Sequence, residues 1–467
     1  METPQSQFPL PVTDVLRGAL KEWHKMSEID SRFSQFYLYR RLQRRMPGNA
    51  KLAVNQFLNE GIKLLQTSYE KEAQFLQARY LDEQPMHRIV NQMNLSESSL
   101  YILQREALQR LTETILTAEQ EATAAQKTVM LERLGGQSCG ELVGLEEQLA
   151  RLQSLVTNPG PPWIIAVEGM GGIGKTTLVN ALLHSLIEGG QVDDIGWVSA
   201  QRERFTFMGK LERDLRPAMT AAQLTEALAK QLLPGSAPER QTNALRTRLK
   251  ELPHVVVIDN LETVPDVESL LPTLQTWANP SKFVLTARES LFGVPQLYHF
   301  KVDELSLAHA LQLIRQEAAL CGLPVLAAGK ESELQPIYET VGGNPLALRL
   351  VVGQTHVYGL QSILYDLRRA RSPTAANLYT YIYQKAWAKL DPLGRQALLV
   401  MPLASPLGDE LEYLAEVGDL DIDELRMALN QLVMLNLVDA RGGLNDRRYS
   451  IHGLTRTFLL EQVAKWM

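Results

Sequence analysis

The chain has 467 residues, and its 47 Lys and Arg against 53 Asp and Glu give a net charge of −6. At roughly 150 residues per domain this length predicts about three domains, and the net charge excludes a protein that binds polyanions through bulk positive charge. The two cysteines, Cys139 and Cys321, lie far apart and outside any CxxC spacing, which excludes a disulfide framework and a zinc cluster. Because no apolar run approaches the ~20 residues of a membrane span and no apolar leader segment begins the chain, the sequence predicts a soluble cytoplasmic protein.

The first 135 residues predict an all-helical module, because their apolar residues recur at spacings of three and four. Within residues 76–115, Met86–Met93 predicts a short helix, and Ser96 is a natural N-cap for a second one. One side of this second helix is an apolar stripe of Leu100, Leu103, Ala107 and Leu111. The opposite side, which faces outward, carries Ser98, Ile102, Arg105 and Gln109. The module is predicted to end at Gly135-Gly136.

The segment 76–115 resembles the helix-turn-helix of sigma-factor region 4 and of response-regulator DNA-binding domains. DNA recognition needs base-edge donors and phosphate-binding Lys or Arg around the second helix. Residues 1–135 hold 17 basic and 16 acidic side chains, and the outward side carries a single charge, Arg105. Sequence-specific DNA binding, a protein-docking or effector-coupling module and a plain helical bundle therefore all stay open, with docking favoured over DNA.

A parallel α/β domain is predicted after the break Asn158–Pro162, where short β-branched runs begin to alternate with helical stretches. Continuous apolar strands of this kind are buried on both faces. We therefore expect a parallel sheet covered on both sides by helices and built from Trp163–Val167, Gly196–Ser199, Val255–Ile258, Phe283–Thr286 and Tyr298–Val302.

A phosphate-binding loop follows the first of these strands, since residues 169–177 fit GxxxxGK[ST] and lead into the helical stretch Leu178–Ile187. In this pattern backbone N–H groups surround the phosphates, Lys175 meets the β- and γ-phosphates, and the Thr176 hydroxyl ligates Mg²⁺. The predicted nucleotide-binding residues of the loop are Gly169, Gly171, Gly172, Ile173, Gly174, Lys175, Thr176 and Thr177.

The strand Val255–Ile258 ends in Asp259-Asn260, which places polar groups at the same edge of the sheet as the loop. A carboxylate there can reach Mg²⁺, so Asp259 is predicted as a metal residue together with Thr176. Fast P-loop ATPases need a carboxylate that orients the attacking water, and Asn260 cannot accept a proton, so slow hydrolysis is predicted. Glu262 is the nearest substitute, although its position also fits a side chain that faces solvent.

From about residue 305 to 371 the apolar period is helical again, and the break at Ser372-Pro373-Thr374 begins a last, mostly helical stretch. Two strand candidates, Leu437–Ala440 and Arg448–Ile451, are joined by a Gly-Gly turn and suit a winged helix. The predicted domains are the helical module 1–135, a linker with an adenine-side segment 136–162, the P-loop NTPase domain 163–304, a helical domain 305–371 and a winged-helix domain 372–467.

The order of these motifs resembles the NB-ARC type of STAND nucleotide-binding switches over roughly residues 141–460. Besides the P-loop, four segments carry the resemblance: Leu142–Glu146, Phe283–Arg288, Gly342–Leu348 and Tyr449–Leu454. In that family the first of these segments packs on the adenine and the second senses the γ-phosphate. The third places a proline against the base, and the fourth contacts the β-phosphate of ADP. The resemblance therefore implies nucleotide contacts for Val143, Pro345 and His452, and catalytic roles for Lys175, Asp259 and Arg288. The chain departs from the family at Leu145 and Gly453, where Arg and Asp are frequent.

The resemblance further implies a molecular switch for signal transduction that binds ATP or ADP with Mg²⁺. A closed state held by ADP would open on exchange for ATP, self-associate and hydrolyse ATP slowly. Relatives usually continue into a repeat sensor, so the sensor here is expected to be the amino-terminal module or another protein. The alternative is an ATP-dependent transcriptional regulator that binds DNA through its helix-turn-helix, whereas an ATPase with rapid turnover is disfavoured by Asn260.

Overall fold

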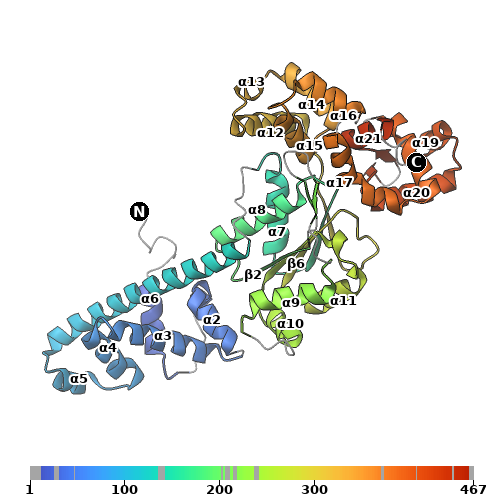
Figure 1. Cartoon of the computed structure of the whole chain (residues 1–467). Helices are drawn as coiled ribbons and strands as arrows, with labels where there is room; N and C mark the ends of the chain where they lie inside the picture. Colours follow the sequence, from blue (N-terminus) through green and yellow to red (C-terminus); the bar gives the residue numbers. More distant parts are fainter. Residues whose placement is uncertain are drawn as a thin grey trace. The chain divides into compact units, whose positions relative to one another are not determined.

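The structure is a computed structural model that describes residues 12–25, 31–46, 48–134, 142–200, 203–205, 211–213, 218–235, 241–369, 373–405, 407–443 and 446–461. It consists of two compact units, Met1–Glu132 and Arg133–Met467, each of which is described separately (Figure 1). The predicted break at Gly135-Gly136 and Cys139 lie outside the described residues. None of the helices in the described part of the chain combines the length and the apolar character needed to cross a bilayer.

The first unit is helical, as the apolar spacing predicts. Its helices pack around a cluster of aromatic rings in which Phe57 lies 5.3 Å from Phe36 and 5.9 Å from Phe33 between ring centroids. Glu119 accepts hydrogen bonds from the backbone N–H groups of Tyr37 and Leu38, which caps the start of one of these helices. In chain order the helices are α1 (Val12–Lys21), η2 (Ser31–Gln35), α2 (Tyr37–Arg45), α3 (Ala50–Gln66), α4 (Glu70–Leu76), η3 (Gln77–Leu81), α5 (Met86–Met93) and the start of α6 (Glu97–Arg133).

The predicted short helix and the stripe after it are both confirmed. Helix α5 has the predicted bounds, and it ends at Asn94 in the left-handed conformation. Ser96 then accepts a hydrogen bond from the Ser99 N–H at the start of α6. The stripe residues Leu100, Ala107 and Leu111 are buried, while the outward-facing Ile102 is 53% exposed. Helix α6 is 37 residues long in total and ends beyond the segment 76–115 that resembles a helix-turn-helix, so it is longer than a recognition helix requires.

The second unit is built on a five-stranded sheet with the order β2-β5-β6-β1-β7, in which all neighbours are parallel. All five predicted strands are present, each within one or two residues of its predicted bounds. Three of them, β1, β5 and β6, are buried along their whole length, as strands covered on both faces should be. The strands are β1 (Ile164–Glu168), β2 (Ile195–Ser199), β5 (Val255–Asp259), β6 (Lys282–Ala287) and β7 (Tyr298–Lys301).

Helices cover both faces of this sheet (Figure 1). One apolar cluster joins β2, β5 and β6 to α9 (Ala221–Leu232), α10 (Gln241–Glu251) and α11 (Val267–Trp277), and α7 (Glu146–Thr157) and α8 (Lys175–Glu188) lie on the other face. A short antiparallel pair that the sequence did not predict, β3 (Glu203–Phe205) and β4 (Leu211–Arg213), follows β2.

The rest of the second unit is helical apart from one hairpin. A single apolar core runs through it, and the rings of Tyr383 and Phe458 stack in this core with 4.5 Å between centroids. The predicted strand pair is present, shifted by one or two residues, as β8 (Asp439–Gly442) and β9 (Arg447–Ser450). The helices are α12 (Leu307–Leu320), α13 (Pro324–Ala327), α14 (Glu331–Val341), α15 (Pro345–Gln354), α16 (Leu360–Arg369), α17 (Pro373–Lys389), α18 (Pro392–Val400), η6 (Met401–Leu403), α19 (Leu411–Gly418), α20 (Ile422–Met434) and α21 (Gly453–Glu461).

The stripe on α6 predicts a large difference between two truncations on the same helix. Leu111→Ala removes a fully buried side chain and should destabilise the first unit by about 3 kcal/mol, whereas Ile102→Ala should change its stability by less than about 0.5 kcal/mol. Native-state hydrogen exchange of the α3 and α6 amides in the full chain measures both. Equal effects of the two substitutions would contradict the packing described above.

Candidate functional site

The P-loop connects β1 to α8, and its backbone explains its glycines. Gly169, Gly172 and Gly174 have φ values of +152°, +78° and +104°, which side chains with a Cβ rarely adopt. Lys175 follows as the first residue of α8, and its ammonium donates hydrogen bonds to the carbonyls of Gly169 (2.7 Å) and Met170 (2.9 Å). The loop therefore folds around its own lysine at the amino terminus of a helix, where anions bind.

Lys175 is buried, and its surroundings change its acidity. Burial is the main cause that lowers the pKa of this ammonium, the positive charge of Arg288 adds to it, and the negative charges of Glu262 and Asp259 oppose it, so that the pKa is about 8. Three charged side chains, from the β5–η5 segment and from the residue after β6, thus act on Lys175 at this edge of the sheet. An added phosphate would raise the pKa of Lys175 again, because an anion close to the ammonium stabilises its charge.

Asp259, at the end of β5, is the centre of a network of hydroxyl groups. Its Oδ1 accepts hydrogen bonds from Thr176 and Thr286, each at 2.7 Å, and its Oδ2 accepts one from Ser199 at 3.0 Å. Burial raises the pKa of Asp259, and these hydrogen bonds oppose the rise. The two predicted metal residues, Thr176 and Asp259, therefore lie in direct contact.

This pair of oxygen donors fits Mg²⁺. The ion prefers octahedral oxygen ligation and usually keeps several waters beside one or two protein ligands and the phosphates of a nucleotide. The described residues contain no cluster of three or more His, Cys, Asp or Glu that could hold a metal alone. A magnesium ion here would be held by the Thr176 hydroxyl and the Asp259 carboxylate together with a nucleotide.

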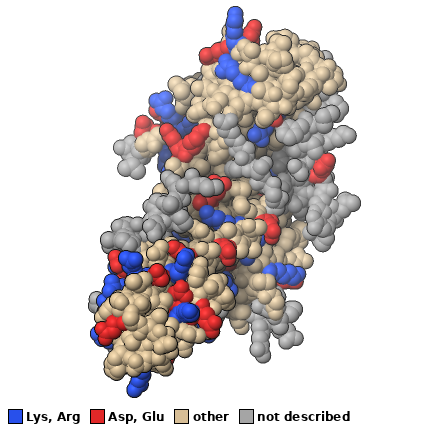
Figure 2. Space-filling view, turned by 90° about the vertical axis from the view of Figure 1, so that its left-hand side faces the viewer, with Lys and Arg blue, Asp and Glu red and all other residues tan. Residues whose placement is uncertain are grey.

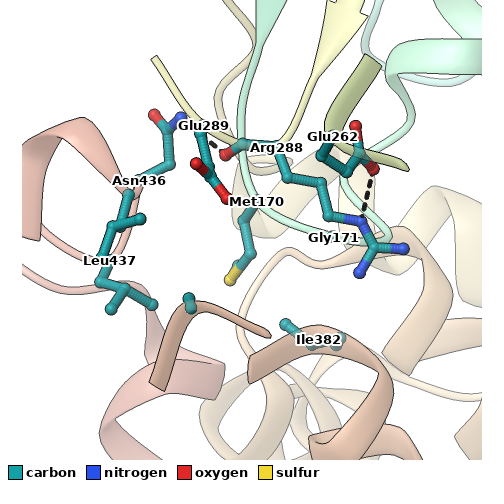
Figure 3. Close-up of a pocket in the computed structure, with 10 residues that line it drawn as sticks. Met170, Gly171, Glu262, Arg288, Glu289, Ile382, Asn436 and Leu437 are labelled. Atoms are coloured by element: carbon teal, nitrogen blue, oxygen red, sulfur yellow. Dashed lines mark hydrogen bonds and ion pairs between the residues drawn. The ribbon is translucent and has the colours of Figure 1, made fainter. Parts of the chain in front are cut away.

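Of the two alternatives open for Glu262, a place near the phosphate loop or a side chain that faces solvent, the second is excluded because the side chain is buried. Glu262 lies on η5 (Leu261–Thr263), the short turn after β5, and its Oε1 accepts a hydrogen bond from Nε of Arg288 at 2.9 Å (Figure 3). The side chains of Glu262 and Arg288 are only 5% and 15% exposed. Arg288 follows β6 and also lies against the P-loop, because a Cβ built on Gly171 would come within 3.2 Å of its Nη1.

The segment that resembles GxPLAL packs directly on the P-loop. Asn344 caps α15 by accepting hydrogen bonds from two backbone N–H groups of its first turn, and its Nδ2 donates to the carbonyl of Gly171 at 3.0 Å. The N–H of Leu346 donates to the carbonyl of Gly172 at 3.3 Å. Pro345 is the first residue of α15 and is thereby held next to the loop.

The segment upstream of α7 lies on another side of the loop. Val143 is buried in the same core as α12 and α15, and Leu145 lies 3.6 Å from a Cβ built on Gly174. Gly144 has a φ of +68° and lies against the ring of His309 on α12, which leaves no space for a side chain at this position. The predicted adenine-side segment is thus held between the start of α8 and the helical region.

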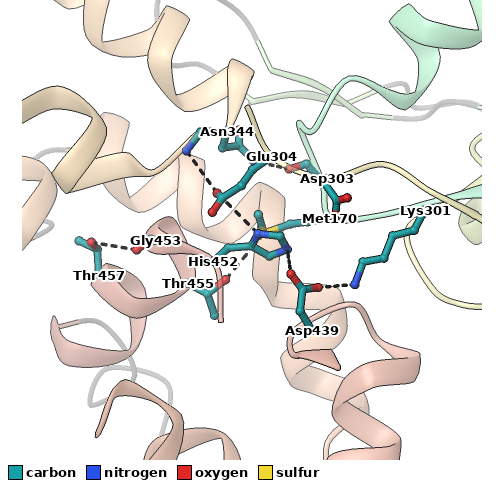
Figure 4. Close-up of polar contacts among 12 residues, drawn as sticks. Met170, Lys301, Asp303, Glu304, Asn344, Asp439, His452, Gly453, Thr455 and Thr457 are labelled. Atoms are coloured by element: carbon teal, nitrogen blue, oxygen red, sulfur yellow. Dashed lines mark hydrogen bonds and ion pairs between the residues drawn. The ribbon is translucent and has the colours of Figure 1, made fainter. Parts of the chain in front are cut away.

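His452 lies between two carboxylates (Figure 4). Its Nδ1 is 3.5 Å from Glu304 and its Nε2 is 3.6 Å from Asp439, which also pairs with Lys301. Burial lowers the pKa of His452, but the hydrogen bond to Glu304 and the negative charges of Asp439 and Glu304 outweigh burial and raise this pKa above its usual value. The ring therefore joins the segment after β7, which carries Glu304, to the hairpin strand β8.

Sequence reasoning missed the short segment that leads away from β6. The carbonyl of Arg288 accepts a hydrogen bond from Nδ2 of Asn436 at 2.9 Å, and Glu289 pairs with Lys389 at 2.6 Å. The Ser290 N–H donates to the carbonyl of Met434 at 2.6 Å. Figure 3 shows Glu289 and Asn436 of this region near the Arg288–Glu262 pair. None of these partners has a local sequence signal, because each pair is separated by at least 100 residues.

The comparisons with known proteins agree with this site. Residues 141–286 match the family described as AAA ATPase domain. The chain is 25% identical over 289 residues to the TMV resistance protein N of Nicotiana glutinosa, a match that covers 59% of this chain and 24% of that protein. It is 26% identical over 308 residues to the regulatory protein AfsR of Streptomyces griseus, a match that covers 63% of this chain and 29% of that protein.

The matched region contains the P-loop, the whole of β5 with Asp259 and all but the last residue of β6. The chain therefore contains a P-loop ATPase domain over residues 141–286, and it is similar to the resistance protein and to AfsR over a longer stretch. Among solved structures, the chain is similar to a STAND protein with a tetratricopeptide repeat sensor from Pyrococcus horikoshii, at 15% sequence identity and a TM-score of 0.31. The match covers 66% of this chain and 41% of that protein's chain. The chain spans less than a third of the length of the two curated relatives named above.

The charges around His452 predict that the stability of this chain depends on pH. A histidine whose folded pKa is raised contributes stability that is complete below its unfolded pKa of about 6.5 and is lost as the pH rises through the higher folded value. The Tm of the wild type should therefore fall between pH 6.5 and pH 8.5 relative to that of His452→Gln. Parallel curves for the two proteins would show that the ring carries no charge in the folded chain.

Proposed function

We propose that this chain is a molecular switch for signal transduction whose state depends on whether ATP or ADP is bound. One observation carries the proposal: segments far apart in the sequence contact one P-loop within a single compact unit. Lys175 and Thr176 come from the loop itself, Asp259 and Arg288 from two strand ends and Asn344 from the start of α15. Such an arrangement connects nucleotide occupancy to the packing of several elements.

In the proposed complex each of these groups has a separate task. Lys175 neutralises the β- and γ-phosphates, Thr176 and Asp259 hold Mg²⁺, and Arg288 contacts the γ-phosphate. Val143 and Pro345 lie on the base side, and His452 reaches the β-phosphate of ADP. Because His452 lies between two carboxylates, contact with a phosphate requires it to move away from Glu304 or Asp439. Bound Mg²⁺ supplies charge neutralisation for the phosphates.

Switching then depends on the difference in affinity between two states. ATP adds a γ-phosphate that ADP lacks, and only such a difference can shift an equilibrium between a closed and an open form. Moving the closed and open populations from 1:99 to 99:1 takes about 5.5 kcal/mol, an amount that a few charged contacts to a phosphate can supply. We propose that the closed form is held by ADP, that the ATP form self-associates, and that hydrolysis is slow.

Lys175→Ala tests nucleotide binding. Removal of the ammonium should abolish measurable affinity for ATP and ADP, since the buried phosphates would lose their main counter-charge. The matched control is Lys230→Ala, because the side chain of Lys230 is 67% exposed on α9 and pairs only with Glu226 across one helical turn among the described residues. Isothermal titration calorimetry on both variants measures the effect, and micromolar binding by Lys175→Ala would refute the assignment of the loop.

A second candidate function is transcriptional regulation through DNA binding by the first unit. The similarity to the regulatory protein AfsR favours it, although a match over 63% of the chain cannot rest on the first 132 residues alone. The outward side of α6 carries a single exposed charge among its four predicted residues, and Lys and Arg are interspersed with Asp and Glu on the face that Figure 2 shows. Docking to a protein therefore stays the favoured role of this unit.

Salt dependence separates the two candidates. If the first unit binds DNA, affinity for mixed genomic fragments should fall by at least about tenfold between 50 and 200 mM salt, since bound Lys and Arg displace counterions from the phosphates. Fluorescence anisotropy of labelled fragments measures this affinity. No binding at 50 mM salt would remove the DNA-binding candidate.

A further inference from the structure

Glu262 is a buried carboxylate that has no role among the proposed nucleotide contacts. It reaches the site because Asn260, directly after β5, has a φ of +60°, a conformation that asparagine tolerates better than most residues. The chain reverses there into η5. Thr263 holds this turn by donating a hydrogen bond from its hydroxyl to the carbonyl of Ala200 at 2.6 Å. The turn directs Glu262 toward the P-loop instead of toward solvent.

The two oxygens of this carboxylate have different surroundings. Oε1 accepts the hydrogen bond from Arg288, whereas Oε2 is buried and accepts no hydrogen bond from any described residue. A buried carboxylate oxygen without a donor costs free energy, and such groups are rare in folded proteins. Oε2 therefore marks a position at which a bound molecule with an O–H or N–H group can donate to Glu262.

The position is close to the reacting end of a bound nucleotide. The Arg288 guanidinium that pairs with Glu262 also lies against Gly171 of the P-loop. Glu262 and Arg288 act in opposite directions on the pKa of Lys175, after the larger effect of burial, so all three charges lie within electrostatic reach of one another. Among the carboxylates that act on Lys175, Asp259 is already surrounded by four donors, while Glu262 retains a free acceptor.

We propose that Glu262 positions the water that attacks the γ-phosphate. In this proposal the ion pair with Arg288 keeps the Glu262 carboxylate from acting on the water until a γ-phosphate draws the guanidinium away. The inference rests on the proposed function, in which Arg288 contacts the γ-phosphate. ADP has no γ-phosphate and leaves the pair intact. The charge pair thus makes both recognition of ATP and the start of hydrolysis depend on one contact.

The chemical step balances with the groups named. The water donates a hydrogen bond to Glu262, and its oxygen forms a bond to the γ-phosphorus while the bond from that phosphorus to the β–γ bridging oxygen breaks. The electron pair of the broken bond leaves with ADP, and the proton of the water passes to Glu262 and then to solvent. Inorganic phosphate is released, and Arg288 returns to the carboxylate.

Glu262→Gln in the full chain tests this inference because it keeps the shape of the side chain and removes its charge. Single-turnover hydrolysis of ATP should fall by at least about 100-fold. Arg288 would no longer be held by a negative charge, so affinity for a non-hydrolysable ATP analogue should rise by at least about fivefold relative to affinity for ADP. A residue with only a structural role would lower both affinities together.

The matched control is Glu268→Gln on α11, which makes the same chemical change at an exposed position and should leave both readouts unchanged. If Glu262→Gln does not fold, Glu262→Asp decides, since its shorter carboxylate should lower hydrolysis and raise the ATP to ADP affinity ratio to a smaller extent. The inference is overturned, and the proposed function is not, if either folded variant binds nucleotide and hydrolyses ATP at the wild-type rate. An equal loss of affinity for the ATP analogue and for ADP has the same meaning. A wild-type chain that binds no nucleotide refutes the proposed function and this inference with it.

Discussion

Four charged side chains, Lys175, Asp259, Glu262 and Arg288, lie together at the buried carboxyl edge of the sheet. Burial of a charge is costly unless partners of opposite sign or hydrogen-bond donors compensate it. Here two positive and two negative groups compensate one another, and they come from three segments at this edge: the P-loop, the end of β5 with η5, and the residues after β6. The position of every loop around the P-loop therefore depends on the others, and a phosphate that enters this group changes the balance for all of them.

Contacts outside the phosphate site extend this dependence toward the carboxyl-terminal helices. Arg288, which pairs with Glu262, also accepts a hydrogen bond from the Asn436 side chain at its backbone carbonyl. The next two residues, Glu289 and Ser290, contact Lys389 and Met434. His452 forms a second connection through Glu304 and Asp439. A movement of Arg288 by even a few ångströms would act on the first set of contacts directly. In the proposed switch, these short polar contacts would connect nucleotide state to the packing of the carboxyl-terminal helices, and they are easier to break than an apolar core.

The elements of the fold were largely predictable because they depend on local patterns. All five strands of the sheet and the bounds of α5 follow from runs of apolar residues and from caps, which act over a few residues. The pair β3–β4 was missed because its three-residue strands carry no periodic pattern. Helix α6 ends at Arg133, close to the predicted end of the helical module, and thus extends beyond the segment 76–115 that resembles a helix-turn-helix.

The sequence by itself determined the parallel α/β core, the P-loop and the residue types needed for phosphate and magnesium chemistry, because loop geometry and strand burial are encoded in short stretches. Only the tertiary structure decided which of these residues meet. The Glu262–Arg288 pair and the two carboxylates at His452 join positions separated by 26, 148 and 13 residues, and no local pattern reports such distances. A buried charge takes its function from its neighbours, and its neighbours are set by the packing of the whole unit.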